Sequence, residues 1–228
     1  MNSTNEQAMA ASLEFLRQTP TGFVTDALNR LGVNGCMVNI RPARGFEDVR
    51  LVGPALTIEF KPRKRSGPRG LTPYDIYYQS EPGKVVVMAG LGHDLVFTGD
   101  NQAHVAKVRG MLGLVIDGGA RDVAGIRSLG LPLWYKGAQT KLAQDALEIT
   151  AYDVPVVAGG VLVNPGDIVV ADEDGVVVVP ADLLDEVVEH IRAVSHIEEQ
   201  LEEAIARGAP LEEIRALIAR KRSPAKSA

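Results

Sequence analysis

The sequence contains a single cysteine, Cys36, which excludes an internal disulfide and cannot form a zinc site by itself. Its apolar runs stay short of the roughly 18 residues that a membrane span needs, so no membrane partner is expected. Residues 1–6 lack the basic start and apolar core of a secretory signal. The net charge of −5 argues against general nucleic-acid binding. These absences predict a cytoplasmic globular protein.

Several enzyme signatures are also missing. The sequence has no Gly-x-Ser-x-Gly elbow, no P-loop and no Rossmann fingerprint. His104, His190 and His196 fall on expected helices without the spacing of a His-Glu-x-x-His metal site. The chain of 228 residues is 46% hydrophobic and 23% charged, which is ordinary for a globular protein of one large domain or two small ones.

The middle of the chain alternates between strand and helix patterns. Strands are expected over 51–60, 84–89, 113–117 and 131–135, and helices from Thr72-Pro73-Tyr74-Asp75 onward, over 98–109 and over 123–129. This order favours a parallel or mixed sheet covered by helices. From residue 147 short strands separated by turns follow, and Asp174-Gly175 is a strong hairpin signal.

The two ends of the chain are predicted to be helical. We expect an N-terminal extension over 1–20 with a helix at 5–18, a core over 21–180 and C-terminal helices over 181–221, the first running from 181 to 207. The tail 222–228 is expected to be disordered. The basic segment 61–70 lacks interleaved aromatic residues, so a solvated loop is favoured over a nucleic-acid patch, and a mobile cover over an anionic substrate is a further alternative.

Two glycine-containing segments follow neighbouring predicted strands. Residues 99–102 open a helix, and a predicted Gly118-Gly119 turn leads into Arg121-Asp122 at the start of another helix. If the strands are adjacent and parallel, both segments reach the same edge of the sheet, where open α/β sheets commonly bind ligands.

These residue types suit a small oxo acid and a divalent cation. Amides at a helix N-terminus bind anions, so residues 99–102 can hold a carboxylate or enolate oxygen. Arg121 offers a planar fork to a carboxylate, and Asp122 and Asp100 offer oxygen ligands to a hard cation. The alternatives are a surface ion pair for Arg121 and Asp122 and a helix N-cap for Asp100.

The motif Gly113-x-Val115-x-Asp117-Gly118-x-x-Arg121-Asp122, with Gly99-Asp100-Asn101 before it and Leu131-Pro132 after it, resembles a known family. It is similar to the 4-hydroxy-4-methyl-2-oxoglutarate/4-carboxy-4-hydroxy-2-oxoadipate aldolases, a family that also contains the RraA-like regulators of ribonuclease E activity. The resemblance runs from about Thr21 to Ile214 and includes segments 52–57 and 172–176.

The resemblance implies an α/β protein, a layered α/β/β/α sandwich similar to the swivelling phosphohistidine domain, with a long C-terminal helix. It implies a homo-oligomer, a trimer or hexamer, with sites between subunits. It further implies a class II retro-aldol lyase that uses Mg²⁺ or Mn²⁺ to cleave a 4-hydroxy-2-oxo acid to pyruvate and a second carbonyl compound. Oxaloacetate decarboxylation would be a side activity, and aromatic compound catabolism the setting.

The resemblance also assigns roles by position. Arg121 matches the arginine that binds the pyruvyl end, Asp122 the direct metal ligand, and Asp100 an acidic group near the metal waters. The amides of Gly99, Asp100, Asn101 and Gln102 match the turn that binds the substrate carboxylate. A glutamate contributed by a neighbouring subunit as part of the metal site matches Glu198 best, with Glu199 one residue off.

Three readings of the function remain open at this stage. RraA regulators lack the aspartate of the Arg-Asp pair, and this chain retains it, which favours the enzyme over a regulatory binding protein without catalysis. A phosphohistidine carrier has only His93 as a nearby candidate. This chain departs from the family at two places: it has Asp100-Asn101 where the family often has Glu-Leu, and Lys136 where the family often has arginine. Lys136 can be interpreted as a Schiff-base lysine or as a solvated residue at the end of a strand.

Overall fold

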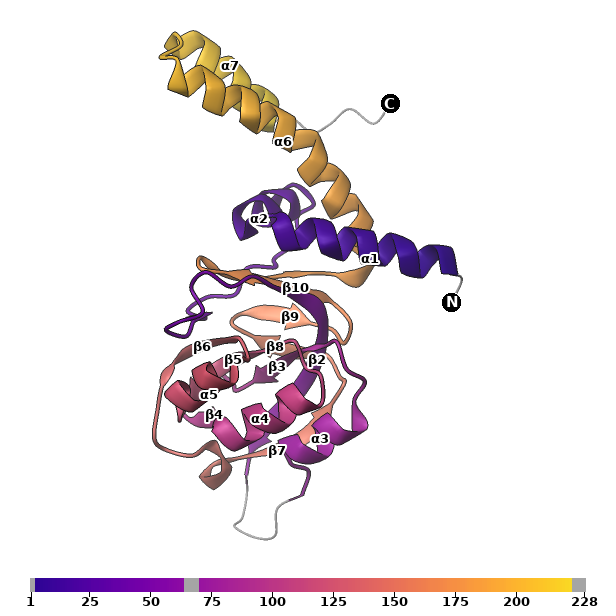
Figure 1. Ribbon diagram of the computed structural model, residues 1–228, viewed down its shortest axis with the longest axis vertical. Coiled ribbons are helices and arrows are strands. Elements are labelled where there is room, and N and C mark those ends of the chain that lie inside the picture. Colours follow the sequence, from indigo (N-terminus) through magenta and orange to yellow (C-terminus); the bar gives the residue numbers. More distant parts are fainter. Residues whose placement is uncertain (1–2, 64–69, 223–228) are drawn as a thin grey trace.

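The computed structural model describes residues 3–63 and 70–222 (Figure 1). The tail beyond residue 222 and the middle of the basic segment 61–70 therefore lie outside the described residues. The helices are α1 (Ser3–Gln18), α2 (Thr21–Arg30), α3 (Pro73–Gln79), α4 (Asp100–Val108), α5 (Val123–Leu129), α6 (Leu184–Ala206) and α7 (Leu211–Arg222). The strands are β1 (Arg41–Pro42), β2 (Leu51–Pro62), β3 (Val85–Ala89), β4 (Val96–Thr98), β5 (Gly113–Ala120), β6 (Leu133–Ala138), β7 (Leu147–Tyr152), β8 (Val156–Ala158), β9 (Val161–Val163), β10 (Ile168–Asp172) and β11 (Gly175–Val179).

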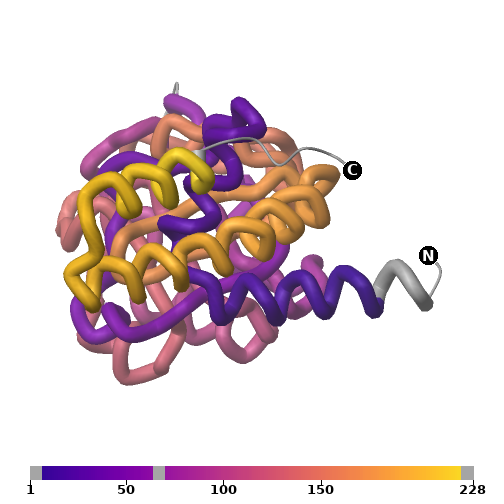
Figure 2. Tube along the Cα trace, turned by 90° about the horizontal axis from the view of Figure 1, so that it is seen from above, coloured from indigo at the N-terminus to yellow at the C-terminus, as the bar shows by residue number. Residues whose placement is uncertain are grey.

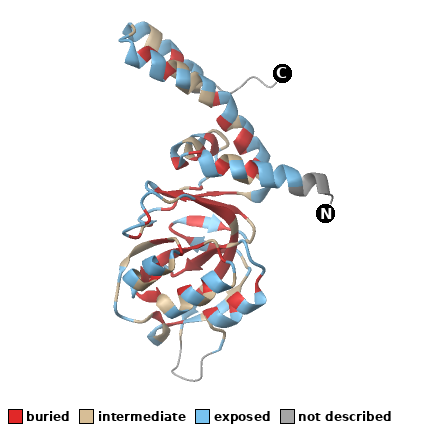
Figure 3. Ribbon diagram, in the orientation of Figure 1, coloured by how far each residue is buried: buried red, intermediate tan, exposed pale blue. Residues whose placement is uncertain are grey.

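The elements stack as helix, strand, strand and helix layers (Figure 1). One core lies between β10, β11 and the helices α1, α2 and α6, with Leu28 fully buried in it. A second core lies between the strand layers around the buried Trp134. A third lies between the sheet and α3, α4 and α5 and contains Leu114 and Ile116. The predicted α/β/β/α layering is confirmed, and Figure 3 shows how the buried positions concentrate on the strands.

A nine-stranded sheet supplies both strand layers. Its order is β1-β6-β5-β3-β2-β10-β11, with β4 added to β5 and β7 added to β2. The long strand β2 pairs with β10 at Leu51–Pro54 and with β7 at Ile58–Pro62, so it passes from one layer to the other. The predicted Asp174-Gly175 hairpin joins β10 to β11, where Asp172 is paired with Gly175.

The predicted Gly118-Gly119 turn is wrong, because both glycines lie inside β5. A Cβ atom on Gly118 would lie 2.2 Å from a ring carbon of Phe97, and one on Gly119 would lie 2.4 Å from Cγ of Gln139. Neither glycine has a positive φ. Glycine is therefore required here for close packing rather than for a turn, and the chain turns only after Ala120.

One strand was missed, and two helix boundaries are corrected. The strand β4 was not predicted, because its three residues carry too short a pattern to be recognised. The helix expected over 181–207 begins with a 3-10 turn, Ala181–Leu183, and the α-helix proper starts at Leu184. The N-terminal helix expected over 5–18 begins earlier, at Ser3.

The C-terminal helices form an arm that extends away from the sheet (Figure 1). α6 and α7 pack side by side, as Figure 2 also shows, and enclose a small cluster around Leu201, Ala204 and Leu217. Among residues 3–63 and 70–222, the structure has no helix with the length and apolar character required to traverse a bilayer.

A buried carboxylate joins the helix layer to the sheet. Asp172, 6% exposed at the end of β10, accepts hydrogen bonds from the backbone N–H and the hydroxyl of Thr21 at 2.9 and 2.8 Å. It also accepts the backbone N–H of Asp174 at 3.0 Å. Because Pro20 provides no side-chain cap, Asp172 satisfies the first amide of α2 from a distant part of the sequence.

Replacing Asp172 by asparagine is expected to lower the free energy of unfolding by about 1–3 kcal/mol, because an amide nitrogen would face buried donors. Urea denaturation followed by circular dichroism measures this change. The neighbouring Glu173 is exposed, so Glu173→Gln is the matched control and should leave the midpoint unchanged. Equal midpoints for the two variants would contradict the capping role of Asp172.

Candidate active site

The two predicted segments meet at one edge of the sheet. β4 pairs with β5 in parallel, and the backbone N–H of Arg121 donates to the carbonyl of Thr98 at 3.1 Å. α4 starts directly after β4 with Gly99 as its N-cap, and α5 starts directly after Arg121-Asp122. The juxtaposition expected from the sequence is therefore present. The strand that precedes residues 99–102 is, however, the short β4 and not β3, which corresponds to the strand predicted over 84–89.

Arg121 and Asp122 form an ion pair at the sheet edge. Nε of Arg121 lies 3.2 Å from Oδ2 of Asp122, and the two side chains are 51% and 45% exposed. Asp122 has a left-handed backbone, with φ 53° and ψ 33°. Aspartate adopts this conformation more readily than most residues, yet it remains sparsely populated. Such a conformation at the start of a helix is often found at functional sites.

Glycines make room for the acidic side chains. A Cβ atom on Gly99 would lie 3.0 Å from Oδ2 of Asp122 and 3.2 Å from Nε of Arg121. A Cβ atom on Gly125 would lie 3.0 Å from Cβ of Asp100. Asp100 is the first residue of α4 and not its N-cap, which corrects the alternative reading of that residue, and its Oδ1 accepts the backbone N–H of Asn101 at 2.7 Å.

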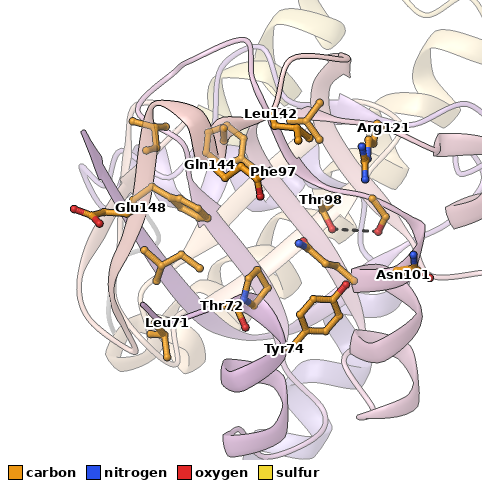
Figure 4. A pocket seen from close by; sticks show the side chains of 18 of the residues that line it. Leu71, Thr72, Tyr74, Phe97, Thr98, Asn101, Arg121, Leu142, Gln144 and Glu148 are labelled. Atoms are coloured by element: carbon orange, nitrogen blue, oxygen red, sulfur yellow. Dashed lines mark hydrogen bonds between the residues drawn. The ribbon is translucent and has the colours of Figure 1, made fainter. Parts of the chain in front are cut away.

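A cavity of about 310 Å³ opens beside these residues. Its near end is lined by Arg121 and by residues 98–102, so the amides of the α4 N-terminus and the guanidinium face the same space. Figure 4 shows Arg121 above Thr98 and Asn101, at the end of the cavity opposite Leu71 and Glu148. This end provides the positive partial charges that bind a carboxylate.

The far part of the cavity was not predicted from the sequence. It is built from the segment before α3, from the connection between β6 and β7, and from β7 itself. Thr72, recognised in the sequence only as the start of a helix, is held by a capping box with Asp75. The hydroxyl and backbone N–H of Thr72 lower the pKa of the Asp75 carboxyl. This box fixes the chain that carries Tyr74 at the cavity.

The donor set of this chain fits a divalent cation only in part. The described residues hold no group of three or more His, Cys, Asp and Glu side chains arranged for a metal. Asp122 and Asp100 are the carboxylates nearest to the Arg121 end of the cavity. Mg²⁺ is commonly held by one or two carboxylates, several waters and the oxygens of its substrate. The residues present therefore fit such a cation together with a chelating oxo acid.

Glu198 and Glu199 lie on the arm and not beside Arg121 (Figure 1). Glu198 forms an ion pair with Lys221 at 2.9 Å, and Glu199 lies 3.6 Å from His196. Burial by itself lowers the pKa of Lys221, but its hydrogen bonds and charge interactions with Glu198 and Asp26 outweigh burial and raise it. The assignment of Glu198 to the site of a neighbouring subunit stays a prediction.

An ion pair between a buried aspartate and a partly buried lysine joins β5 to β6. Nζ of Lys136 lies 2.9 Å from Oδ1 of Asp117, and the Asp117 side chain is only 7% exposed. The other oxygen of Asp117 accepts the backbone N–H of Gly92 at 3.1 Å. Lys136 is therefore neither a solvated strand end nor positioned at the cavity. His93 lies exposed in the same loop, between β3 and β4.

The fold and the arginine-aspartate turn define an α/β protein of a known class. The model of the family described as "RraA-like: Aldolase/RraA" matches residues 21–178, and the chain belongs to this family. It is 31% identical over 215 residues to protein DlpA of Legionella pneumophila, a match that covers 94% of this chain but only 35% of that longer protein.

Two further comparisons extend over nearly the whole chain. A Halalkalibacterium halodurans protein named "Putative 4-hydroxy-4-methyl-2-oxoglutarate aldolase" is 32% identical, with 86% of this chain and 90% of that protein covered. The crystal structure of Streptomyces coelicolor RraAS2, titled an unusual member of the RNase ES inhibitor RraA protein family, is 31% identical with a TM-score of 0.74. That match covers 86% of this chain and 96% of RraAS2.

Lys136→Met is expected to destabilise the fold by about 3 kcal/mol, because it leaves the buried Asp117 carboxylate without its cation. Urea denaturation measures the loss, and Lys141→Met, at an exposed lysine of the segment that follows β6, is the matched control. The double variant Asp117→Asn/Lys136→Met should recover most of the stability. A double variant as unstable as Lys136→Met would argue against an unpaired charge as the cause.

Proposed function

We propose that this protein is a divalent-metal-dependent lyase that cleaves a 4-hydroxy-2-oxo acid to pyruvate and a second carbonyl compound. The observation that carries the proposal is the Arg121-Asp122 turn at the mouth of a cavity whose same end is formed by the α4 N-terminus. The similarity to the Halalkalibacterium halodurans protein, which is named as an aldolase and is covered over 90% of its length, supports it.

Different groups of the chain would bind the carboxylate, the ketone oxygen and the metal ion. The amides at the start of α4, with Gly99 as N-cap, bind the carboxylate of the oxo acid. The guanidinium of Arg121, which lines the cavity, would contact the ketone oxygen, on which negative charge develops during cleavage. Asp122 would hold Mg²⁺ or Mn²⁺, which when bound supplies Lewis-acid polarisation of the ketone, and Asp100 stays free to act as a base.

The bond changes follow from this arrangement. Oδ2 of Asp100 accepts the proton of the 4-hydroxyl, directly or through a water, while Oδ1 stays fixed by the amide of Asn101. The C3–C4 bond then breaks, C4 becomes a carbonyl, and the electron pair moves into the enolate of pyruvate. The enolate takes the proton back at C3. Oxaloacetate would give the same enolate by loss of carbon dioxide, so its decarboxylation is an expected side activity.

The assembly is part of the proposal. A homotrimer or homohexamer would bring Glu198 of a neighbouring copy toward Asp122. This glutamate would add a metal ligand to a site for which the described residues of one chain provide fewer than three grouped ligands. Within its own chain Glu198 is paired with Lys221, so this role requires the pair to open or to be shared.

A non-catalytic regulatory binding protein is the second candidate function. It is favoured by the similarity to RraAS2, whose title places it among RNase ES inhibitors. Purified protein that inhibits an RNase E-type nuclease, while releasing no pyruvate from any 4-hydroxy-2-oxo acid in the presence of Mg²⁺, would favour this candidate over the lyase.

Arg121→Ala is expected to reduce kcat/KM by about 100- to 1000-fold, because it removes a fixed cation from the charge that develops in the transition state. Arg121→Lys keeps the charge but loses the planar fork, so it should recover only part of the activity. Pyruvate release coupled to lactate dehydrogenase measures both. Arg50→Ala, at an exposed arginine before β2, is the control, and full turnover in Arg121→Ala would refute the site.

Asp122→Asn is expected to weaken Mn²⁺ binding at least 10-fold with little change in stability, since asparagine also tolerates the left-handed backbone. Electron paramagnetic resonance titration measures binding, and thermal unfolding checks the fold. Asp153, exposed with the same φ of 53°, gives the matched control Asp153→Asn. A chelator should abolish pyruvate release and Mg²⁺ should restore it; activity that survives the chelator would contradict the metal requirement.

A further inference from the structure

The strand β5 changes its parallel neighbour at Asp117 and Gly118. Up to Ile116 it pairs with β3, and from Gly119 onward it pairs with β4. At the same point its register with β6 shifts, so that Asp117 and Gly118 both lie opposite Lys136. Such bulges are frequent next to active sites, where they redirect the chain. The pairing with β4 that brings residues 99–102 to the sheet edge therefore begins directly after Asp117.

The carboxylate of Asp117 holds the loop 90–95, which joins β3 to β4. Its Oδ2 accepts the backbone N–H of Gly92 at 3.1 Å, and its Oδ1 lies 2.9 Å from Nζ of Lys136. A Cβ atom on Gly92 would lie 3.3 Å from the same Nζ, so the three groups are packed together. Asp117 thus fastens the middle of the loop to the bulge in β5.

The loop has a conformation that its own residues disfavour. Leu91 has a φ of 55°, and its side chain is 51% exposed, so packing of that side chain does not compensate for the left-handed backbone. Such conformations persist only where neighbouring contacts impose them. The bond from Gly92 to Asp117 is a contact of this kind, and without an acceptor at position 117 the loop is expected to relax.

The end of the loop determines where α4 begins. The carbonyl of Leu95 accepts the backbone N–H of Gly119 at 2.8 Å. The strand β4 that follows has only three residues, and the carbonyl of the last of them accepts the backbone N–H of Arg121. A movement of loop 90–95 is therefore transmitted through β4 to residues 99–102, whose amides form the near end of the cavity.

We propose that Asp117 is a positioning residue for the reaction, because through the Gly92 amide it keeps β4, and with it the carboxylate-binding amides of α4, in place beside Arg121. This inference rests on the proposed lyase function. Neither Asp117 nor Lys136 is among the described residues that line the cavity, so the effect on the substrate is indirect. Lys136 supplies the opposite charge that a buried carboxylate requires, whereas the oxygen that accepts the Gly92 N–H acts on the site.

The experiment compares double variants that all remove the ion pair. Asp117→Asn/Lys136→Met keeps an oxygen for the Gly92 N–H, whereas Asp117→Leu/Lys136→Met has a side chain of similar shape without an acceptor. Asp117→Ala/Lys136→Met also lacks the acceptor, introduces no larger apolar group and should behave like the leucine variant. Thermal unfolding checks that each variant folds, since neutral replacements of a buried pair are tolerated far better than the loss of one partner.

Calorimetric titration with pyruvate in the presence of Mg²⁺ measures the effect on the site. The asparagine variant should bind pyruvate within about threefold of the unmodified protein, and the two variants without an acceptor should bind it about 10-fold more weakly, as expected for a hydrogen bond to the carboxylate that is no longer well placed. Binding of Mn²⁺ alone, measured by electron paramagnetic resonance, should be equal in all of them, because Asp122 follows β5 and not β4.

Hydrogen exchange tests the positioning without any ligand. The segment 95–103 should exchange about 10-fold faster in the variants without an acceptor than in the asparagine variant, while β3 exchanges equally in all of them. Equal exchange of segment 95–103 would overturn the inference, and so would equal pyruvate affinities in variants that differ in exchange. Faster exchange in a protein that binds no pyruvate even when unmodified would refute the lyase and leave the positioning of β4 by Asp117 standing.

Discussion

The site depends on the parallel pairing of the short strand β4 with the end of β5. That pairing places the N-termini of α4 and α5 side by side, and the bond from Arg121 N–H to the Thr98 carbonyl closes the gap between them. It requires glycine at two positions of β5: the ring of Phe97 lies against the backbone at Gly118, and the side chain of Gln139 lies against it at Gly119. The same ring forms part of the cavity. The contact of Phe97 with Gly118 therefore fixes both the packing of β5 and the shape of the cavity.

The meeting of the two segments at the near end of the cavity could be predicted from the sequence, because the residues of each segment are contiguous. Arg121-Asp122 and residues 99–102 each follow a strand and open a helix, and that local order implies a common sheet edge. The alternation of strand and helix patterns predicted a sheet covered by helices, and the resemblance to the family predicted its layering. The predicted Gly118-Gly119 turn was wrong because a pair of glycines is compatible with a turn and with a tight contact alike, and only the side chains of Phe97 and Gln139 decide between them.

The far end of the cavity could not be predicted. Leu71, Leu142 and Ile149 come from segments distant in the sequence, and each alone is an ordinary apolar residue near a loop or an edge strand. Their meeting depends on where β7 joins β2 and where the connection after β6 returns past β4. The role of Asp172 could not be predicted either. Its carboxylate accepts the first amide of α2 from a position 151 residues later in the sequence, and no local pattern indicates that role.

The arm formed by α6 and α7 has a consequence for local stability. Its outer part has its own apolar cluster around Leu201, Ala204 and Leu217, separate from the three cores of the body. The start of α6 packs on α2 in the core of the helix layer, whereas α7 is linked to α2 through Lys221, which lies 3.3 Å from Asp26 and 6.0 Å from the ring centre of Phe23. Opening this hairpin exposes little apolar surface, so it forms a separate cooperative unit. Its amide hydrogens will exchange with solvent through fraying events in which the nine-stranded sheet stays intact.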